Sequence, residues 1–122
     1  MEAYTDPSIF QTILRNLIIN GIKYTGNGGE VYIAAIENSD WVEVSVKDNG
    51  IGMDESMLAD LFRLDKVRSS PGTDNETGTG LGLLLCKEFI RMYDGQIWVE
   101  SAPGEGSCFT FTIRSKHKVF DI

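Results

Sequence analysis

Apolar residues recur at the spacing of an α-helix in three stretches of the chain. The first stretch follows Asp6-Pro7, where an aspartate suited to cap a helix precedes a proline suited to its first turn, and it runs to about Tyr24. The second is a short helix capped by Asp54. The third follows the glycines near residue 80 and is expected to end at Asp94-Gly95, with Gly95 as the first residue beyond the cap. The first two helices carry apolar faces made of Ile9, Phe10, Ile13, Leu14, Leu17 and Ile18, and of Met57, Leu58, Leu61 and Phe62.

Alternation of apolar and polar residues predicts two β-hairpins. In the first, strands around residues 31–35 and 42–46 are joined by a short turn at residues 37–40. In the second, strands around residues 97–99 and 109–113 are joined through a bend at Pro103-Gly104-Glu105-Gly106. The order helix, hairpin, helix, loop, helix, hairpin predicts that helices cover one face of a mostly antiparallel sheet.

Three segments carry no such pattern. Residues 64–78 are rich in Ser, Thr, Asp, Asn and Gly, and a loop of this length in a compact domain is either a functional lid or disorder. Residues 116–122 form a tail without a clear assignment. Residues 1–5 read like the end of a strand whose start is missing, so we expect the chain to be one domain of a longer protein.

Composition narrows the class of protein. The 122 residues suffice for one hydrophobic core, and a net charge of −7 argues against a general nucleic-acid binder. No run approaches the roughly 20 apolar residues that span a membrane, and no secretory signal pattern occurs. Cys86 and Cys108 lack CxxC spacing, and a reduced pair suits a cytoplasmic chain.

Polar residues interrupt the apolar pattern on one side of the first helix. Asn16, Asn20 and Lys23 lie at positions i, i+4 and i+7, which places them on one face within roughly 60° of one another. A structural interpretation is that the two asparagines fix the helix to a neighbouring loop, because a buried polar group needs partners. A functional interpretation is that an amide oxygen ligates Mg²⁺ while the lysine approaches a phosphate, since Mg²⁺ typically takes one or two protein oxygens beside phosphate oxygens.

A second polar stretch, Asp48-Asn49-Gly50-Ile51-Gly52, follows the second strand. It can be a simple turn, because Asn-Gly is a common turn dipeptide. Alternatively, Asp48 accepts a hydrogen bond from the amino group of adenine, while Gly50 and Gly52 let the base lie against the backbone.

A third stretch, Gly78-Thr79-Gly80-Leu81-Gly82-Leu83, leads from the polar loop into the third helix. Glycines allow the backbone to approach a ligand closely, and the start of a helix offers free N–H groups that suit a phosphate. The three stretches together indicate a nucleotide site.

As a set, these stretches resemble the ATP-binding catalytic domain of sensor histidine kinases, in the superfamily shared with gyrase-type, heat-shock-chaperone and mismatch-repair ATPases. Residues 16–25 are similar to its asparagine box, and residues 48–52 and 78–83 to its two glycine boxes. Leu61-Phe62 is similar to its phenylalanine box, and residues 104–107 to its last glycine motif. The resemblance implies a Bergerat-type α/β two-layer sandwich (α+β). It has a mixed, mostly antiparallel sheet covered on one face by three helices, and an ATP lid at about residues 64–78.

The resemblance also implies ligands and roles. Asn20 would bind Mg²⁺ with support from Asn16, and Lys23 and Tyr24 would contact phosphate and sugar. Asn16, Asn20 and Lys23 would therefore carry catalysis. Asp48 would bind the adenine of ATP beside Gly50 and Gly52. The phosphates would be cradled by Gly78, Thr79, Gly80, Leu81 and Gly82.

Two further roles are implied with less detail. Ser107 would help to hold water beside the adenine-binding aspartate. Lys66 or Arg68 in the lid would reach the γ-phosphate, and their spacing does not choose between them.

Two departures from the family pattern occur. Gly21 stands where the family usually has alanine, which costs about 1 kcal/mol of helix propensity and permits closer packing. The phenylalanine box lacks its second aromatic residue, with Leu64 or Asp65 in that place, so lid closure is expected to differ in detail.

Two residues that some members of the superfamily carry, a glutamate and an acceptor histidine, are missing here, and their absence helps to distinguish the classes of relatives. Members that hydrolyse ATP, and the serine kinases that regulate sigma factors, carry a glutamate one turn before the metal asparagine. Here that position is Asn16, which cannot accept a proton near neutral pH. The only histidine, His117, lies in the tail outside any acceptor motif, so the phosphorylated histidine is expected on a separate dimerisation domain, with a response regulator downstream.

The expected function is thus transfer of the γ-phosphate of Mg-ATP to a histidine in a two-component sensor kinase. The domain is expected in the cytoplasm, and anchoring of the parent protein in the inner membrane is left open. The isolated domain is expected to be monomeric. Alternatives are a stand-alone serine kinase of the anti-sigma type and a nucleotide-binding or docking module without catalysis. A P-loop or Rossmann enzyme is disfavoured, because no Gly-Lys-Ser/Thr occurs and the glycines follow a polar loop instead of a strand.

Overall fold

The computed structural model describes residues 6–26, 28–38, 40–62, 70–71, 77–78 and 81–115. The expectations for residues 1–5 and for the tail at 116–122, including His117, lie outside the described residues. So do most of the expected lid, with Lys66 and Arg68, and the pair Thr79-Gly80.

Three helices form where the periodicity places them: α1 (Pro7–Thr25), α2 (Glu55–Asp60) and α3 (Leu81–Met92). The Asp6 carboxylate accepts a hydrogen bond from the Ser8 N–H at 2.8 Å, which caps α1. The Asp54 carboxylate accepts one from the Met57 N–H at 2.9 Å, which caps α2. Both predicted caps are confirmed.

The end of α3 differs from the prediction. Asp94, with φ of 60°, takes the left-handed conformation that we assigned to Gly95. The Gly95 N–H still closes the helix by donating to the Ile90 carbonyl at 2.9 Å. Glycine is required there for another reason: a Cβ would lie 2.1 Å from the Thr112 carbonyl oxygen of the neighbouring strand.

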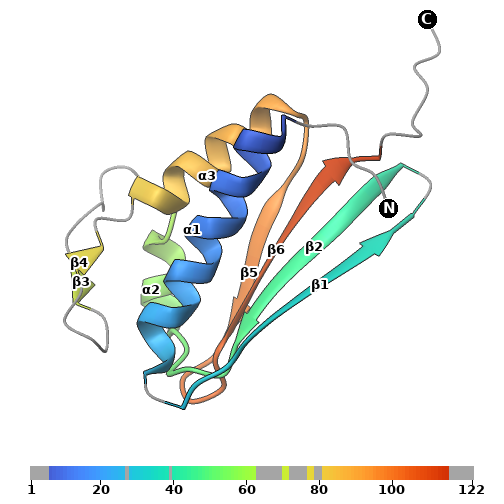
Figure 1. Cartoon of the computed structure of the whole chain (residues 1–122). Coiled ribbons are helices and arrows are strands. Elements are labelled where there is room, and N and C mark those ends of the chain that lie inside the picture. The colour runs from blue at the N-terminus through green and yellow to red at the C-terminus, as the bar shows by residue number, and fades with distance from the viewer. Residues whose placement is uncertain are drawn as a thin grey trace, which may run out of the picture.

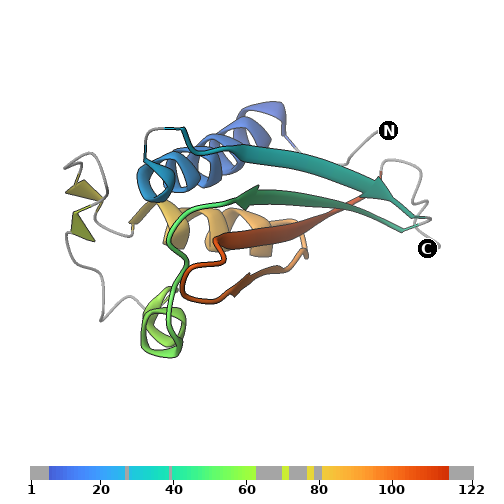
Figure 2. The ribbon, with the colours of Figure 1, turned by 90° about the horizontal axis from the view of Figure 1, so that it is seen from below.

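Four strands form the main sheet: β1 (Val31–Glu37), β2 (Trp41–Asp48), β5 (Ile97–Ser101) and β6 (Ser107–Arg114). Their order is β1-β2-β6-β5, which Figure 2 shows across the sheet. Both predicted hairpins are confirmed. Every pairing among the described strands is antiparallel, so the expected mixed character of the sheet is not found in this part of the chain.

A second, two-stranded pairing joins β3 (Ser70–Pro71) to β4 (Thr77–Gly78) within the expected lid. This pairing could not be predicted from the sequence, because no apolar alternation accompanies strands of two residues.

The helices cover one face of the main sheet, and the core lies between the two layers (Figure 1). Alternation along β2 and β6 turns every second side chain toward the helices. The buried apolar residues of this core are Ile13, Leu17, Val42, Val44, Val46, Met53, Leu83, Cys86, Ile90, Phe109, Phe111 and Ile113. Within the described part of the chain, no helix has both the length and the apolar character needed to cross a membrane.

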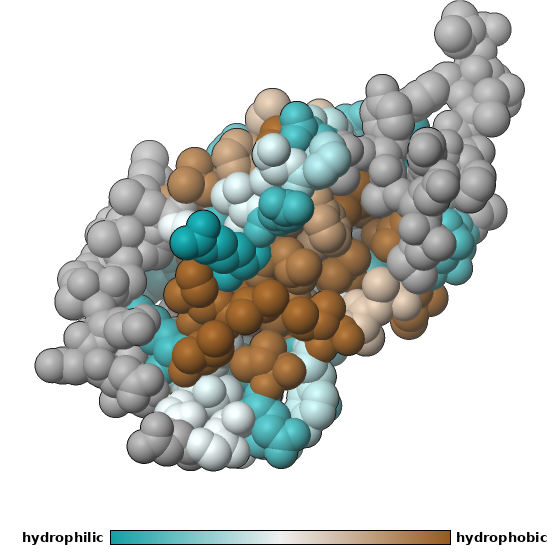
Figure 3. Space-filling model, in the orientation of Figure 1, coloured by the Kyte–Doolittle hydropathy of each residue, from teal (hydrophilic) through white to brown (hydrophobic). Residues whose placement is uncertain are grey.

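Strand β1 is an edge of this sheet, and its apolar side chains are largely exposed. Tyr32, Ile33 and Ile36 are 53%, 51% and 64% exposed. Figure 3 shows apolar side chains gathered over the C-terminal half of α1 and the adjoining sheet. No described strand pairs with the outer edge of β1.

Candidate nucleotide-binding site

Asp48 is the last residue of β2, and its side chain is 3% exposed. Its carboxylate accepts hydrogen bonds from the backbone N–H groups of Gly50, at 2.9 Å, and Ser107. Burial raises the pKa of Asp48 above its ordinary value, and these two hydrogen bonds act in the opposite direction. An acceptor fixed in this way can receive a hydrogen bond from a ligand, as the sequence predicted for an amino-bearing base.

Gly50 brings the loop after β2 against the end of α1. A Cβ on Gly50 would lie 2.1 Å from the carbonyl oxygen of Tyr24, so only glycine fits. The same carbonyl accepts a hydrogen bond from the Ile51 N–H at 3.2 Å. Two of the predicted motifs, far apart in the sequence, are therefore in direct contact.

The loop after β2 also meets the turn between β5 and β6. Gly52 has φ of 71°, and a Cβ there would lie 1.9 Å from the Ala102 carbonyl oxygen. Gly106 has φ of 75°, and a Cβ there would lie 2.1 Å from the Asp48 carbonyl oxygen. The Gly104 N–H donates to the Ile51 carbonyl at 2.7 Å. The two glycine-rich turns thus form one continuous floor.

Ser107 lies on this floor, buried, directly opposite Asp48 in the β2–β6 register. Its hydroxyl lies 2.8 Å from that of Ser101, a residue that sequence reasoning missed. The Ser101 hydroxyl also bonds to the backbone of both turns: it accepts from the Met53 N–H and donates to the Gly106 carbonyl. Ser101 pairs with Ser107 across the second hairpin, and this cross-strand register is the feature that could have identified Ser101.

Asn16 connects α1 to the start of α3. Its side-chain amide donates to the Thr12 carbonyl at 3.0 Å, and a Cβ on Gly82 would lie 3.0 Å from its Oδ1 atom. Cys86 lies beside it, fully buried, with its thiol 3.7 Å from the Ile13 carbonyl. Burial raises the pKa of Cys86 to about 11, and a hydrogen bond with the Asn16 side chain acts against that rise. The asparagine and second glycine motifs therefore pack together.

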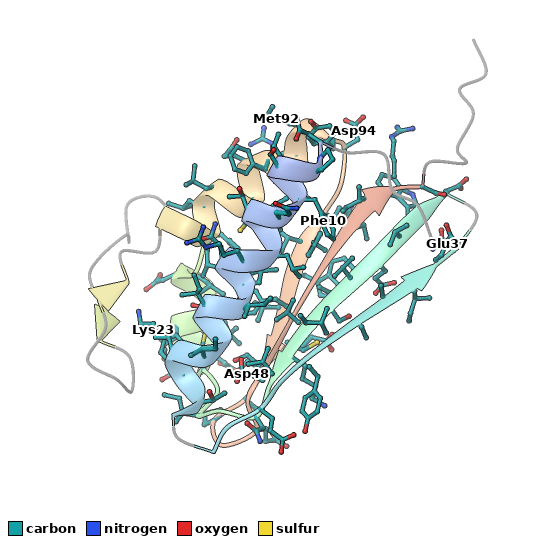
Figure 4. The ribbon with its side chains drawn as sticks, viewed as in Figure 1. Phe10, Lys23, Glu37, Asp48, Met92 and Asp94 are labelled. Carbon is teal, nitrogen blue, oxygen red and sulfur yellow. The ribbon has the colours of Figure 1, made fainter. Side chains whose placement is uncertain are left out.

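Asn20, Lys23 and Tyr24 follow along α1. Asn20 is half-buried, and Lys23 is buried, with its ammonium 5.2 Å from the centre of the Tyr24 ring. Lys23 and Asp48 lie at the same end of the molecule, whereas Met92 and Asp94 lie at the other (Figure 4).

The remaining predicted phosphate-binding residues are placed only in part. Gly78 belongs to β4, and Leu81 is the first residue of α3. Thr79 and Gly80, between them, lie outside the described residues. The described residues hold no group of three or more His, Cys, Asp or Glu side chains placed to bind a metal ion.

A family model described as "Histidine kinase-, DNA gyrase B-, and HSP90-like ATPase" matches residues 5–117. The chain belongs to this family. The resemblance stated from the sequence is confirmed, and ATP is the nucleotide of this family.

Relatives and solved structures agree with this assignment. The adaptive-response sensory kinase SasA of Synechococcus sp. (strain CC9902) is 41% identical over 113 residues, and that of Parasynechococcus marenigrum (strain WH8102) is 42% identical over 113. Each match covers 92% of this chain and 29% of the relative, so the chain spans less than a third of those kinases.

The catalytic domain of histidine kinase ThkA, in a nucleotide-free form, aligns with a TM-score of 0.73 at 31% identity, over 91% of this chain and 70% of that one. A structure of full-length ShkA in complex with AMPPNP aligns with a TM-score of 0.69 at 28% identity, over 88% of this chain and 22% of that one. The α/β sandwich of this chain is thus that of histidine-kinase catalytic domains.

Proposed function

We propose that this chain binds Mg-ATP and transfers the γ-phosphate to a histidine on a separate dimerisation domain of a two-component sensor kinase. The observation that carries the proposal is that motifs distant in the sequence contact one another in the fold. The Asp48 loop touches Tyr24 at the end of α1, and Asn16 touches Gly82 at the start of α3. The similarity to sensory kinases and to a kinase that binds AMPPNP supports it.

Adenine binds against the floor in this proposal. The Asp48 carboxylate is held by two backbone N–H groups and accepts the hydrogen bond of the adenine amino group. Gly50 and Gly52 let the backbone beside Asp48 pack directly against the Tyr24 and Ala102 carbonyls, which holds the loop in place for the base. Ser107 stands beside the carboxylate and helps to hold water there.

The phosphates lie along α1 and toward the start of α3. Asn20 offers one amide oxygen, a hard ligand of the kind that Mg²⁺ accepts together with phosphate oxygens, so the residue present fits the ion. Asn20 would hold the ion there, and the chemistry that Mg²⁺ would supply is neutralisation of phosphate charge. Lys23 contributes a cation near the ring of Tyr24, which contacts the sugar. The stretch from Gly78 to Gly82 supplies backbone N–H groups, and either Lys66 or Arg68 reaches the γ-phosphate.

Asn16 explains why the acceptor is an imidazole and not water. A carboxamide is not basic near neutral pH, so Asn16 cannot act as a general base in the place where hydrolysing relatives carry a glutamate. A histidine acceptor is a better nucleophile than water and needs less help. The same reasoning disfavours the stand-alone serine kinase.

The rest of the signalling path belongs to the same proposal. The acceptor histidine resides on the dimerisation domain, and a response regulator then receives the phosphate. We place this domain in the cytoplasm. Catalysis is then positioning and charge neutralisation, with the γ-phosphate held in line with the acceptor.

The decisive experiment is a calorimetric titration with a non-hydrolysable ATP analogue, with and without Mg²⁺, using GTP as the competing nucleotide. We expect Mg-dependent binding selective for adenine. Asn20→Ala is expected to lose the Mg-dependent part of binding while its circular dichroism spectrum stays unchanged. Gln11→Ala is the matched control, because it removes an exposed amide from the same helix away from the site.

Three outcomes are informative. Unchanged binding in Asn20→Ala would remove Asn20 from the site. Binding without phosphorylation of an added histidine-containing dimerisation domain would favour the docking module. Phosphorylation of a serine-bearing partner without that domain would favour the anti-sigma type of kinase.

A further inference from the structure

We propose that Ser101 is a positioning residue for nucleotide recognition. Its hydroxyl joins the two glycine-rich turns that form the floor of the site, and it thereby keeps Asp48 in place. Ser101 is the last residue of β5, outside every motif that the sequence analysis singled out. The inference rests on the proposed function, in which Asp48 receives the adenine amino group.

The Ser101 hydroxyl has partners in three directions. Its oxygen accepts a hydrogen bond from the Met53 N–H at 2.8 Å and donates to the Gly106 carbonyl at 2.7 Å. The Ser107 hydroxyl lies 2.8 Å away. A hydroxyl has one donor and two acceptor positions, so these three contacts satisfy it when Ser107 donates to it.

These partners belong to the two turns that form the floor. Met53 directly follows Gly52, which ends the loop after Asp48, whereas Gly106 and Ser107 end the turn between β5 and β6. One side chain therefore bridges both turns.

The bridge leads directly to Asp48. The Ser107 N–H is one of the two backbone donors to the Asp48 carboxylate, and the Gly106 Cα lies against the Asp48 carbonyl. A shift of the turn at Gly106 and Ser107 moves that donor away from the carboxylate. Ser101 acts in this way through its neighbours, without contact with the nucleotide.

The test uses a pair of variants with the same shape. Ser101→Thr keeps the hydroxyl, and Ser101→Val replaces it by a methyl group of similar size, so the two differ only in the hydrogen bonds. The affinities for ATP and inosine triphosphate are measured for each, because inosine triphosphate lacks the amino group that Asp48 is proposed to receive. Thr110→Val is the control for a sheet hydroxyl away from the floor, where Thr110 lies 3.5 Å from the Ser45 hydroxyl.

In Ser101→Val we expect the preference for ATP over inosine triphosphate to shrink by about tenfold, the scale of one lost hydrogen bond to a charged group. Ser101→Thr is expected to keep the wild-type preference, and so is Thr110→Val. A merely structural role for Ser101 would lower the active fraction and leave the ratio of the two affinities unchanged.

Equal preference in Ser101→Val and Ser101→Thr would overturn the inference. A wild-type protein without any preference for ATP would instead overturn the proposed role of Asp48, so the two failures are distinguishable. If the valine variant does not fold, hydrogen exchange of the wild type decides. The Met53 N–H, although in a loop, is expected to exchange slowly, and rapid exchange there would refute the bridge.

Discussion

At the scale of the residue, the proposed role of Asp48 in binding carries a cost to stability. The carboxylate is buried, and burial raises its pKa above the ordinary value of 3.8. The folded protein therefore binds this proton more tightly than the unfolded chain does. The resulting contribution to stability is present below the unfolded pKa and is lost as pH rises through the raised folded pKa.

Asp48→Asn is accordingly expected to melt at the same temperature as the wild type or higher at pH 7, and to lose selective binding of ATP. Removing the charge removes its desolvation cost, but an amide no longer offers a carboxylate to the adenine amino group. Thermal melts from pH 7 down toward 4, with parallel ATP titrations, check both effects. At each pH, the melting temperature of Asp48→Asn is compared with that of the wild type. If the variant loses stability relative to the wild type at pH 7 but not at pH 4, the charge on Asp48 is not destabilising.

Cys86 is a buried thiol that is expected to resist chemical modification in the folded protein. Its side chain is fully buried, and its pKa is raised to about 11, so almost no thiolate forms near neutral pH. A thiol reagent at pH 8 is expected to modify Cys108, which is partly exposed, and to reach Cys86 only in denaturant. Cys108→Ser should then show no fast-reacting thiol in the native state. Rapid modification of that variant would mean that the α1–α3 interface opens readily.

At the scale of the element, the contact between α1 and α3 positions Asn16 beside the proposed phosphate-binding stretch. Gly82→Ala adds a methyl group 3.0 Å from the Asn16 Oδ1 atom, which is the tip of a side chain and can move. We expect stability to be unchanged or higher by up to about 1 kcal/mol, because alanine favours the helix. ATP affinity is expected to fall by about tenfold as Asn16 is displaced. Denaturant melts and calorimetry measure the two quantities.

Gly28→Ala is the control for this change. Gly28 has φ of 80°, and a Cβ there would meet none of the described atoms within 4 Å. It is expected to cost about 1 kcal/mol through backbone strain and to leave ATP affinity unchanged. If Gly82→Ala bound ATP like the wild type, the α1–α3 contact would have no part in the site.

At the scale of the whole molecule, the exposed apolar side chains of β1 are expected to favour self-association. β1 carries only one charged residue, Glu37, its apolar side chains are exposed, and no strand in the described part of the chain pairs with its outer edge. Such an edge is prone to association. Ile36→Lys, at a position 64% exposed, is expected to reduce self-association at high protein concentration without loss of stability.

Met92→Lys is the matched control, because Met92 is 67% exposed on α3 and lies far from this edge (Figure 4). Light scattering against concentration compares the two variants with the wild type. Equal behaviour of Ile36→Lys and Met92→Lys would show that loss of exposed apolar surface in general, and not the strand edge, controls association.

The sequence by itself determined the elements of this protein and the residue types of its site. Helix periodicity, strand alternation and the caps Asp6 and Asp54 are local, so they can be read from neighbouring residues. The asparagine and glycine motifs were sufficient to indicate the family, which the comparison confirms.

Only the tertiary structure decided what the motifs touch. The closeness of Gly50 to Tyr24, of Gly82 to Asn16 and of Gly95 to Thr112 depends on the packing of elements distant in sequence. Ser101 could not be singled out from its own segment, because its role depends on hydrogen bonds to two turns that meet only in the folded chain.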